Sequence, residues 1–248
     1  MEPAREAAGK RRSMSHATRS IIIPFYNEEA CARFVLDEVR ACQPKAEIIA
    51  VDDGSRDGTW TVICGTASVN GLRLTQNRGQ SAAMYAGMRA ASGEYIVLMD
   101  GDGQNDPADI ERLIDRLQQG SLDVVCGQRV KRLDTWSRRR ASQVANAIRR
   151  SVLNDGISDT GCSLKVFRRE HVELLVPFNG LHRYLPAIFK HANLRIAEMP
   201  VNHRARTQGV SKYTNWNRAW RGIYDLFGVR WLLNRKVVYP RMEQHDGA

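Results

Sequence analysis

The sequence predicts an α/β fold: a mostly parallel, Rossmann-like sheet with helices on both faces, followed by an amphipathic helix near the C-terminus. Over the first 130 residues, short apolar runs alternate with helical patterns. Several of these runs end directly at acidic or glycine-containing segments, as strands do at the functional edge of such sheets. A hydrophobic content of 43% and a charged content of 26% are those of a globular protein.

The elements are expected in a regular order. The apolar run 21–23 before Pro24 predicts the first strand, and helical spacing of apolar residues follows from Glu28 to Cys42. Further strands are expected over 48–51, 72–75, 95–99 and 124–126, with helices over 80–91, from Pro107 onward, over 136–153 and over 216–233, and a polar loop over 202–214.

This pattern divides the chain into three parts. We expect a flexible basic tail over 1–19, one catalytic domain over 20–214, and an amphipathic membrane-interface helix with a C-terminal tail over 215–248. No secretory signal is expected, and no run of about 18 apolar residues is present, so any membrane role would be peripheral. The five cysteines lack paired spacing, which favours reduced thiols.

Charge is unevenly distributed along the chain. Residues 1–124 hold 14 Lys/Arg against 18 Asp/Glu, whereas residues 125–248 hold 23 against 9, which gives net charges of −4 and +14. The positive charge of the second half therefore favours an anionic partner. The candidates are a membrane lipid, a nucleic acid and a phosphorylated substrate. The alternative is a solvated basic surface.

The acidic segment that follows the strand over 95–99 is the strongest chemical feature. Asp100 and Asp102 would bind a hard divalent cation that also bridges a substrate diphosphate, and Gln104 would add a neutral oxygen. Gly101 permits close approach of phosphate or sugar. The alternative for this segment is a solvated turn or helix cap.

A second acidic strand end lies at Asp53. Its carboxylate would accept hydrogen bonds from a nucleotide base or ribose, or it would form an Asx turn leading into a helix that starts at Asp57–Thr59. Because the carboxyl ends of parallel strands share one edge of a sheet, this segment, the acidic segment and 24–28 are expected to meet there.

The motifs PFYNEE, VDDGSRDGT, NRGQSAAMYAGMRAASGEYIVLMDGDGQNDP and RARTQGVSKY occur in this order. The chain thereby resembles inverting family 2 glycosyltransferases of the dolichyl-phosphate mannose synthase and polyprenyl-phosphate glycosyltransferase type, which have a GT-A fold. The resemblance implies a nucleotide-sugar site at Pro24, Tyr26, Glu28, Val51, Asp53, Asp100, Gly101 and Gln104, a Mg²⁺ or Mn²⁺ site at Asp100, Asp102 and Gln104, and catalytic roles for Asp102, Arg129, Arg206 and Lys212.

The predicted chemistry joins two anionic reactants. The metal would act as a Lewis acid on the donor diphosphate, basic residues would lower the repulsion, and attack from the opposite face would invert the anomeric centre. A phosphate acceptor needs no general base, whereas a hydroxyl acceptor does. Asp159 is the candidate for that base, and its alternative role is in a turn before Thr160 and Gly161.

Three departures from the family pattern limit what the resemblance implies. The run Gly161–Lys165 replaces a Ser-Gly-aromatic-Arg run, which leaves the acceptor ligand and the sugar open. No QxxRW motif is present, which argues against a processive polysaccharide synthase. Bacterial relatives often carry C-terminal transmembrane hairpins, so attachment here would come from the helix over 216–233 or from a membrane-protein partner.

The sequence therefore predicts a peripheral enzyme at the cytoplasmic face of the cell membrane. Its partners would be a nucleotide sugar donor, a polyprenyl (undecaprenyl or dolichyl) phosphate acceptor and the membrane surface. One alternative keeps the fold and changes the acceptor to a hydroxyl of a glycan, lipid or small molecule. Another is a non-catalytic protein that binds nucleic acid, which rests on charge alone because no nucleic-acid motif is present.

Overall fold

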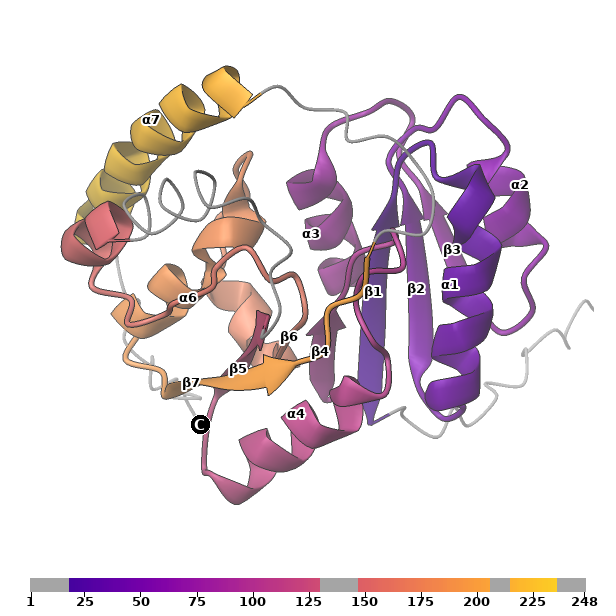
Figure 1. Ribbon diagram of the computed structural model, residues 1–248, viewed down its shortest axis with the longest axis horizontal. Coiled ribbons are helices and arrows are strands. Elements are labelled where there is room, and N and C mark those ends of the chain that lie inside the picture. The colour runs from indigo at the N-terminus through magenta and orange to yellow at the C-terminus, as the bar shows by residue number, and fades with distance from the viewer. Residues whose placement is uncertain (1–17, 130–146, 206–214, 236–248) are drawn as a thin grey trace, which may run out of the picture.

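The computed structural model describes residues 18–129, 147–205 and 215–235, with side chains from 224 onward in the last range. Within these residues, seven strands form one sheet in the order β3-β2-β1-β4-β6-β5-β7 (Figure 1). The strands are β1 (Arg19–Phe25), β2 (Glu47–Asp52), β3 (Asn70–Arg73), β4 (Tyr95–Leu98), β5 (Val124–Arg129), β6 (Lys165–Arg168) and β7 (Ile196–Val201).

The N-terminal half of the sheet is parallel. β1 lies between β2 and β4 and pairs with both in parallel, and β2 pairs in parallel with β3. The central strands are buried on both sides, which explains their continuous apolar runs. The acidic segments after β2 and β4 therefore leave the sheet at the same edge as Phe25 at the end of β1.

Among the named strands, the departure from parallel pairing lies in the C-terminal half of the sheet. β6 runs antiparallel to both β4 and β5, and β7 then pairs in parallel with β5. This insertion brings the segment before β6 next to the end of β4. The mostly parallel, Rossmann-like fold class is confirmed.

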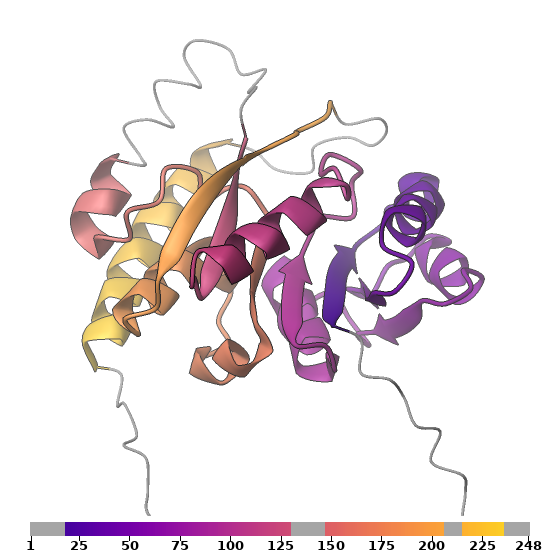
Figure 2. The same ribbon diagram turned by 90° about the horizontal axis from the view of Figure 1, so that it is seen from below.

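Helices cover both faces of the sheet (Figure 2). One face is packed by α1, α2 and α4, and the other by α3, α6 and α7, with a separate apolar cluster in each layer. The helices are α1 (Glu29–Cys42), α2 (Thr59–Cys64), α3 (Gln80–Ala90), α4 (Asp109–Gln119), η1 (Arg169–Leu174), α6 (Leu181–His191) and α7 (Asn215–Arg235), with a further helix over 147–153.

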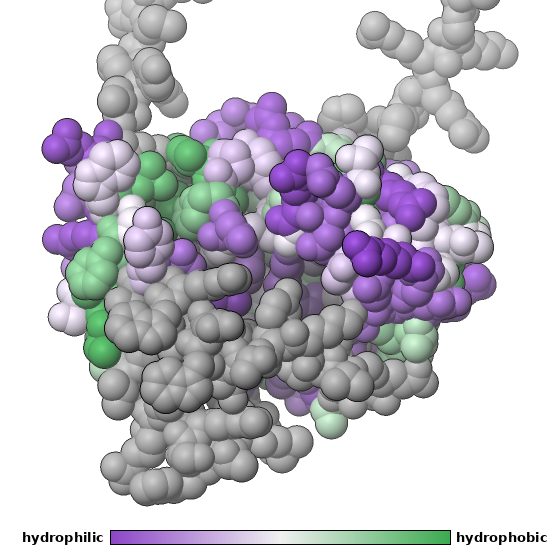
Figure 3. Space-filling view, turned by 90° about the horizontal axis from the view of Figure 1, so that it is seen from above, coloured by the Kyte–Doolittle hydropathy of each residue, from purple (hydrophilic) through white to green (hydrophobic). Residues whose placement is uncertain are grey.

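The C-terminal helix α7 is amphipathic, as predicted. Its inner side packs toward α6 through Leu226, Val229 and Leu233, which are all at most 5% exposed. Its outer side carries aromatic side chains: Tyr224 is 82% exposed, Phe227 62% and Trp231 63%. In Figure 3, apolar and pale side chains gather toward the α7 end of the molecule, while hydrophilic ones dominate the opposite end. Among the described helices, none is both long and apolar enough to cross a membrane.

Candidate active site

The acidic segment after β4 is a tight loop fixed by its own side chains. Asn105 Oδ1 accepts a hydrogen bond from the backbone N–H of Asp100 at 2.9 Å, and Asp102 Oδ1 accepts one from the N–H of Gln104 at 3.1 Å. At Gly101, a Cβ atom would lie 2.6 Å from the Phe25 ring, so the close approach of this loop to β1 requires glycine. The predicted role of this glycine is therefore at least partly structural.

Polar groups from two other elements surround the Asp100 carboxylate. Gln80, at the start of α3, donates from Nε2 to Asp100 Oδ1 at 2.6 Å. Ser163 donates from Oγ to Asn105 Oδ1 at 2.9 Å, and the buried cation of Lys165 acts on Asp100; both side chains lower its pKa. Burial, and then the negative charge of Asp102, raise the pKa of Asp100 to about 6.

These carboxylates fit a divalent cation. No cluster of three or more His, Cys, Asp or Glu side chains suited to a metal occurs in the part of the chain that the structure describes. Mg²⁺ is commonly held by one or two carboxylates together with substrate phosphates and water, so Asp100 and Asp102 suffice as protein ligands. After burial, the second cause of the raised pKa of Asp100 is the negative charge of Asp102, and a bound cation would relieve that repulsion.

Asp53 lies at the end of β2 and holds the loop before α3. It is 2% exposed, and its carboxylate accepts hydrogen bonds from Asn77 Nδ2 at 2.8 Å and from the N–H groups of Arg78 and Gly79 at 2.7 and 2.8 Å. Burial raises its pKa, against the lowering effect of these bonds. The carboxylate of Asp53 makes no Asx turn in the described residues. The bond with that spacing is made by Asp57, whose Oδ1 accepts the N–H of Thr59 at 3.1 Å where α2 begins.

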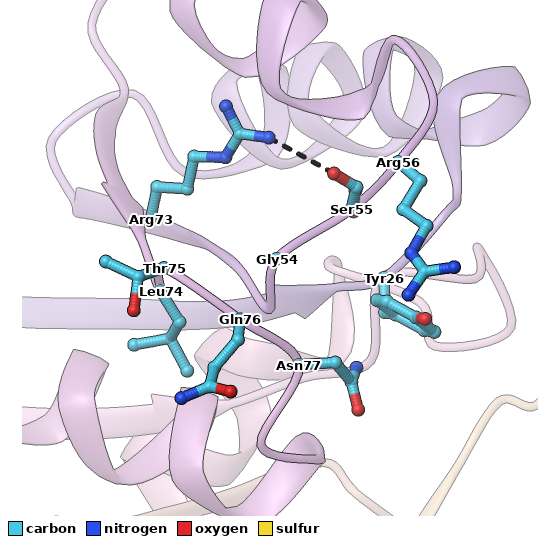
Figure 4. Close-up of a pocket in the computed structure, with 9 residues that line it drawn as sticks. All are labelled: Tyr26, Gly54, Ser55, Arg56, Arg73, Leu74, Thr75, Gln76 and Asn77. Atoms are coloured by element: carbon cyan, nitrogen blue, oxygen red, sulfur yellow. Dashed lines mark hydrogen bonds between the residues drawn. The ribbon is translucent and has the colours of Figure 1, made fainter.

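An open pocket of about 550 Å³ lies beside Asp53, at the ends of β1, β2 and β3 (Figure 4). Arg73 reaches across it and donates to the Ser55 carbonyl at 3.1 Å, while Tyr26 and Arg56 lie together on another side. The lining residues are Tyr26, Gly54, Ser55, Arg56, Arg73, Leu74, Thr75, Gln76 and Asn77. An aromatic ring, two guanidinium groups and several amides suit a ligand with a flat polar ring.

The remaining predicted nucleotide residues lie at the same edge of the sheet. Pro24 and Val51 are partners in the β1–β2 register. Val51 is fully buried in the core, so its place in the nucleotide site stays a prediction. Glu28, just after β1, donates its N–H to Thr59 Oγ1 at 2.9 Å, which joins this segment to the start of α2.

Arg129, at the end of β5, forms a bidentate ion pair with Asp159. Its Nε and Nη2 atoms each lie 2.8 Å from a carboxylate oxygen. Burial works against the charged guanidinium, but the hydrogen bonds and charge of Asp159 raise the pKa of Arg129, and Asp100 adds a smaller attraction in the same direction. Asp159 begins a turn through Thr160 and Gly161, in which its carbonyl accepts the N–H of Cys162 at 3.3 Å. Its carboxylate is 6% exposed and holds Arg129, so it does not face solvent as a general base would.

The acidic loop is joined to the segment that follows β7. The backbone carbonyl of Gln104 accepts a hydrogen bond from the N–H of Arg204 at 2.9 Å. The side-chain Nε2 of Gln104 donates to the backbone carbonyl of Arg204 at 3.3 Å. Arg204 is also ion-paired to Glu38 and Asp106. The Gln104 amide therefore holds this segment, and its role as a metal ligand stays a prediction. Arg206 and Lys212 lie outside the described residues.

The sequence matches the Glycosyl transferase family 2 profile over residues 20–175. The chain belongs to this family. It is 36% identical over 230 residues to a dodecaprenyl-phosphate galacturonate synthase of Rhizobium johnstonii, which covers 88% of this chain and 68% of the relative. It is 35% identical over 203 residues to an undecaprenyl-phosphate 4-deoxy-4-formamido-L-arabinose transferase of Aeromonas hydrophila, which covers 78% of this chain and 62% of the relative. The chain thus spans about two thirds of the length of these relatives.

Solved structures share the fold of this family 2 member. Glucosyl-3-phosphoglycerate synthase from Mycobacterium tuberculosis, in complex with phosphoglyceric acid, superimposes with a TM-score of 0.68 at 19% identity, covering 88% of this chain and 80% of that chain. A complex of the same enzyme with Mn²⁺, uridine diphosphate and glucosyl-3-phosphoglycerate also gives 0.68, at 18% identity, covering 87% and 79%. The predicted GT-A fold and the resemblance to polyprenyl-phosphate glycosyltransferases are confirmed.

Sequence reasoning missed three residues that contact or lie near the acidic loop. Gln80 hydrogen-bonds to Asp100, Ser163 hydrogen-bonds to Asn105 in the same loop, and the buried positive charge of Lys165 acts on Asp100. A signal for two of them was present, because Ser163 and Lys165 belong to the run that departs from the family pattern. Their proximity to Asp100 follows from the antiparallel insertion of β6 next to β4, which the sequence pattern did not indicate.

Proposed function

We propose that this protein transfers a sugar, with inversion, from a nucleotide diphosphate sugar to the phosphate of an undecaprenyl or dolichyl phosphate. The observation that carries the proposal is the arrangement of two acidic side chains, Asp100 and Asp102, after β4 and the guanidinium of Arg129 at the end of β5. Both strands run antiparallel to β6, so they end at the same edge of the sheet. The names of the relatives, which are polyprenyl-phosphate sugar transferases, support the choice of acceptor.

Each part of the site has a task in this reaction. The pocket beside Asp53 would hold the nucleoside, since its Tyr26, Arg56 and Arg73 side chains suit a base and a ribose. A divalent cation on Asp100 and Asp102 would neutralise charge on the departing diphosphate. Arg129, with the predicted Arg206 and Lys212, would lower the repulsion between that diphosphate and the attacking lipid phosphate.

The acceptor class can be tested directly by product formation. Parent protein, Mn²⁺ and a panel of UDP-, GDP- and CDP-sugars are incubated either with undecaprenyl phosphate or with undecaprenol, which offers a hydroxyl on the same chain. We expect a glycolipid from the phosphate with at least one donor, and none from the alcohol. Product from the alcohol alone would establish a hydroxyl acceptor, and no product from any pair would refute the proposal.

Metal affinity should depend on pH through Asp100. Because its pKa is raised to about 6, a proton competes with the cation below that pH. The deprotonated fraction of such a group falls about tenfold between pH 7 and pH 5, so we expect Mn²⁺ to bind about tenfold more weakly at pH 5. Calorimetric titration of Mn²⁺ at both values measures this, and equal affinities would contradict it.

We also propose that the outer side of α7 attaches the protein to the cytoplasmic face of the membrane. Exposed Tyr224, Phe227 and Trp231 share one side of the helix, and its sequence carries four arginines against one aspartate. Aromatic side chains with basic neighbours favour the interface of an anionic bilayer. A membrane-protein partner is the other route by which this face would be covered.

Vesicle binding should depend on these aromatic side chains. Losing about 1.5 kcal/mol for each of two side chains lowers partitioning about a hundredfold, so we expect that effect when Phe227 and Trp231 are both replaced by Gln. Cosedimentation with vesicles of phosphatidylcholine and phosphatidylglycerol measures it. Phe34→Gln is the control, since Phe34 is 50% exposed on α1. Equal binding of both variants, or no binding by the parent, would contradict the membrane role.

A further inference from the structure

Within residues 18–129 and 147–205, the hydrogen bonds of the Arg129 guanidinium all lie on its Nε–Nη2 edge. Asp159 accepts hydrogen bonds from Nε and Nη2, both at 2.8 Å, and a third from the backbone N–H of Arg129 at 3.2 Å. An arginine side chain has five N–H bonds, so these contacts use two of them and leave those on Nη1 and the second on Nη2, the outer edge of the group, for another anion. The side chain is 21% exposed, so part of it reaches solvent.

A second carboxylate, Glu198 on β7, fixes the loop that carries Asp159. Glu198 accepts hydrogen bonds from the N–H of Ser158 at 2.9 Å, from its Oγ at 3.0 Å, and from the N–H of Asp159 at 3.0 Å. Gln128, beside Arg129 on β5, donates to Ser158 Oγ at 2.8 Å and closes the network. Both the guanidinium and the loop that supports it are therefore tied to paired strands.

The packing around this network leaves little freedom. A Cβ atom at Gly161 would lie 2.8 Å from Arg129 Nη2 and 3.5 Å from Asp159 Oδ1. β5 and β7 pair in register from Val124 to Arg129, so Glu198 has a fixed position relative to Arg129. Rigid supports of this kind matter in catalysis because a displacement of about 1 Å can cost about a hundredfold in rate.

We propose that Glu198 is a positioning residue which, through Asp159, orients the outer edge of Arg129 toward a substrate phosphate. The inference rests on the proposed function, since the ligand of that edge is the donor diphosphate or the acceptor phosphate. Asp159 is then an anchor for the cation and not the general base that a hydroxyl acceptor would require. Glu198 itself touches no substrate.

Kinetics can separate positioning from a merely structural role. Glu198→Gln, which keeps the shape and removes the charge, should lower kcat/KM about tenfold in the parent. In an Arg129→Ala background the same change should alter kcat/KM less than twofold, because the residue through which it acts is gone. A rise in KM for the nucleotide sugar would assign the outer edge to the donor diphosphate, and a rise for undecaprenyl phosphate would assign it to the acceptor.

The matched control is Glu173→Gln, which removes an exposed carboxylate that is ion-paired to Arg89. It should leave kcat/KM unchanged in both backgrounds. If Glu198→Gln or Asp159→Asn lowered kcat/KM equally with and without Arg129, the residue would act independently of the guanidinium and the inference would be wrong.

A second measurement does not require turnover. The ¹⁵N–¹Hε signal of Arg129, assigned by its loss in Arg129→Lys, should be sharp in the parent because Nε donates to Asp159. It should broaden through solvent exchange in Glu198→Gln and stay sharp in Glu173→Gln. A sharp signal in Glu198→Gln would overturn the inference. An inactive parent would refute the proposed function, and the spectra would still decide whether Glu198 supports Arg129.

Discussion

Asp102→Asn should lower kcat/KM for sugar transfer about a thousandfold. The substitution keeps the size of the side chain and its acceptor for the Gln104 N–H, which lies 3.1 Å from Asp102 Oδ1, and removes the charge that a divalent cation needs. Loss of the cation would leave the diphosphate charge unbalanced as the bond to the sugar breaks, which costs several kcal/mol in the transition state. Initial rates at saturating and limiting donor measure the change.

The control for this variant is Asp115→Asn on the exposed side of α4. It makes the same chemical change on an element that contributes no side chain to the site, so its kcat/KM should match that of the parent. An Asp102→Asn enzyme that keeps more than about a tenth of the parent activity would show that the acidic loop does not hold a catalytic cation.

Arg206→Ala should raise KM for undecaprenyl phosphate about thirtyfold and change the KM for the donor little. Hydrogen bonds between charged groups contribute about 1.5 to 3 kcal/mol, which corresponds to about ten- to a hundredfold in affinity. Arg206 lies beyond the described residues, but the chain enters its segment at Arg204, which is bonded to the acidic loop. Steady-state kinetics with each substrate varied in turn measure both constants.

Arg116→Ala on the exposed side of α4 is the matched control and should leave both constants unchanged. An unchanged KM for the lipid phosphate in Arg206→Ala would remove this residue from the acceptor site. It would also favour the alternative in which the acceptor is a hydroxyl.

The parallel half of the fold could be predicted because its strands are buried on both faces. In an alternating α/β pattern, a continuous apolar run such as Ile21–Ile23 indicates a strand buried in a parallel sheet. The predicted strand boundaries agree with the structure to within a few residues. β3 is the least accurate, since Asn70–Arg73 replaces the expected 72–75. This edge strand is short and largely exposed, so hydrophobicity specifies it weakly.

The C-terminal half could not be predicted in the same way. β6 and β7 are short or polar, and α6 contains Pro186, which usually disfavours a helix interior. Of the expected helix over 136–153, only 147–153 lies within the described residues and is helical there. The pairing of β6 with β4 is a long-range contact that no local pattern encodes.

The candidate site was likewise predictable only in part. Asp53, Asp100 and Asp102 follow apolar strands, so the sequence placed them at one edge of the sheet. Their detailed roles depend on partners distant in sequence: Asp53 holds the loop at Arg78 and Gly79, and Asp100 contacts Gln80. The bond between Asp159 and Arg129 likewise joins the end of β5 to a loop that lies 30 residues further along the chain.

The most direct test of a cation-dependent donor site is thermal denaturation with UDP, GDP or CDP, with and without Mn²⁺. A ligand at about a hundred times its Kd stabilises the native state by about 2.7 kcal/mol. We predict that one nucleotide raises Tm strongly with Mn²⁺ present and little without it, and that Asp102→Asn abolishes the difference. Equal stabilisation of the parent and Asp102→Asn would contradict the cation site, and no stabilisation of the parent by any nucleotide would contradict the donor site itself.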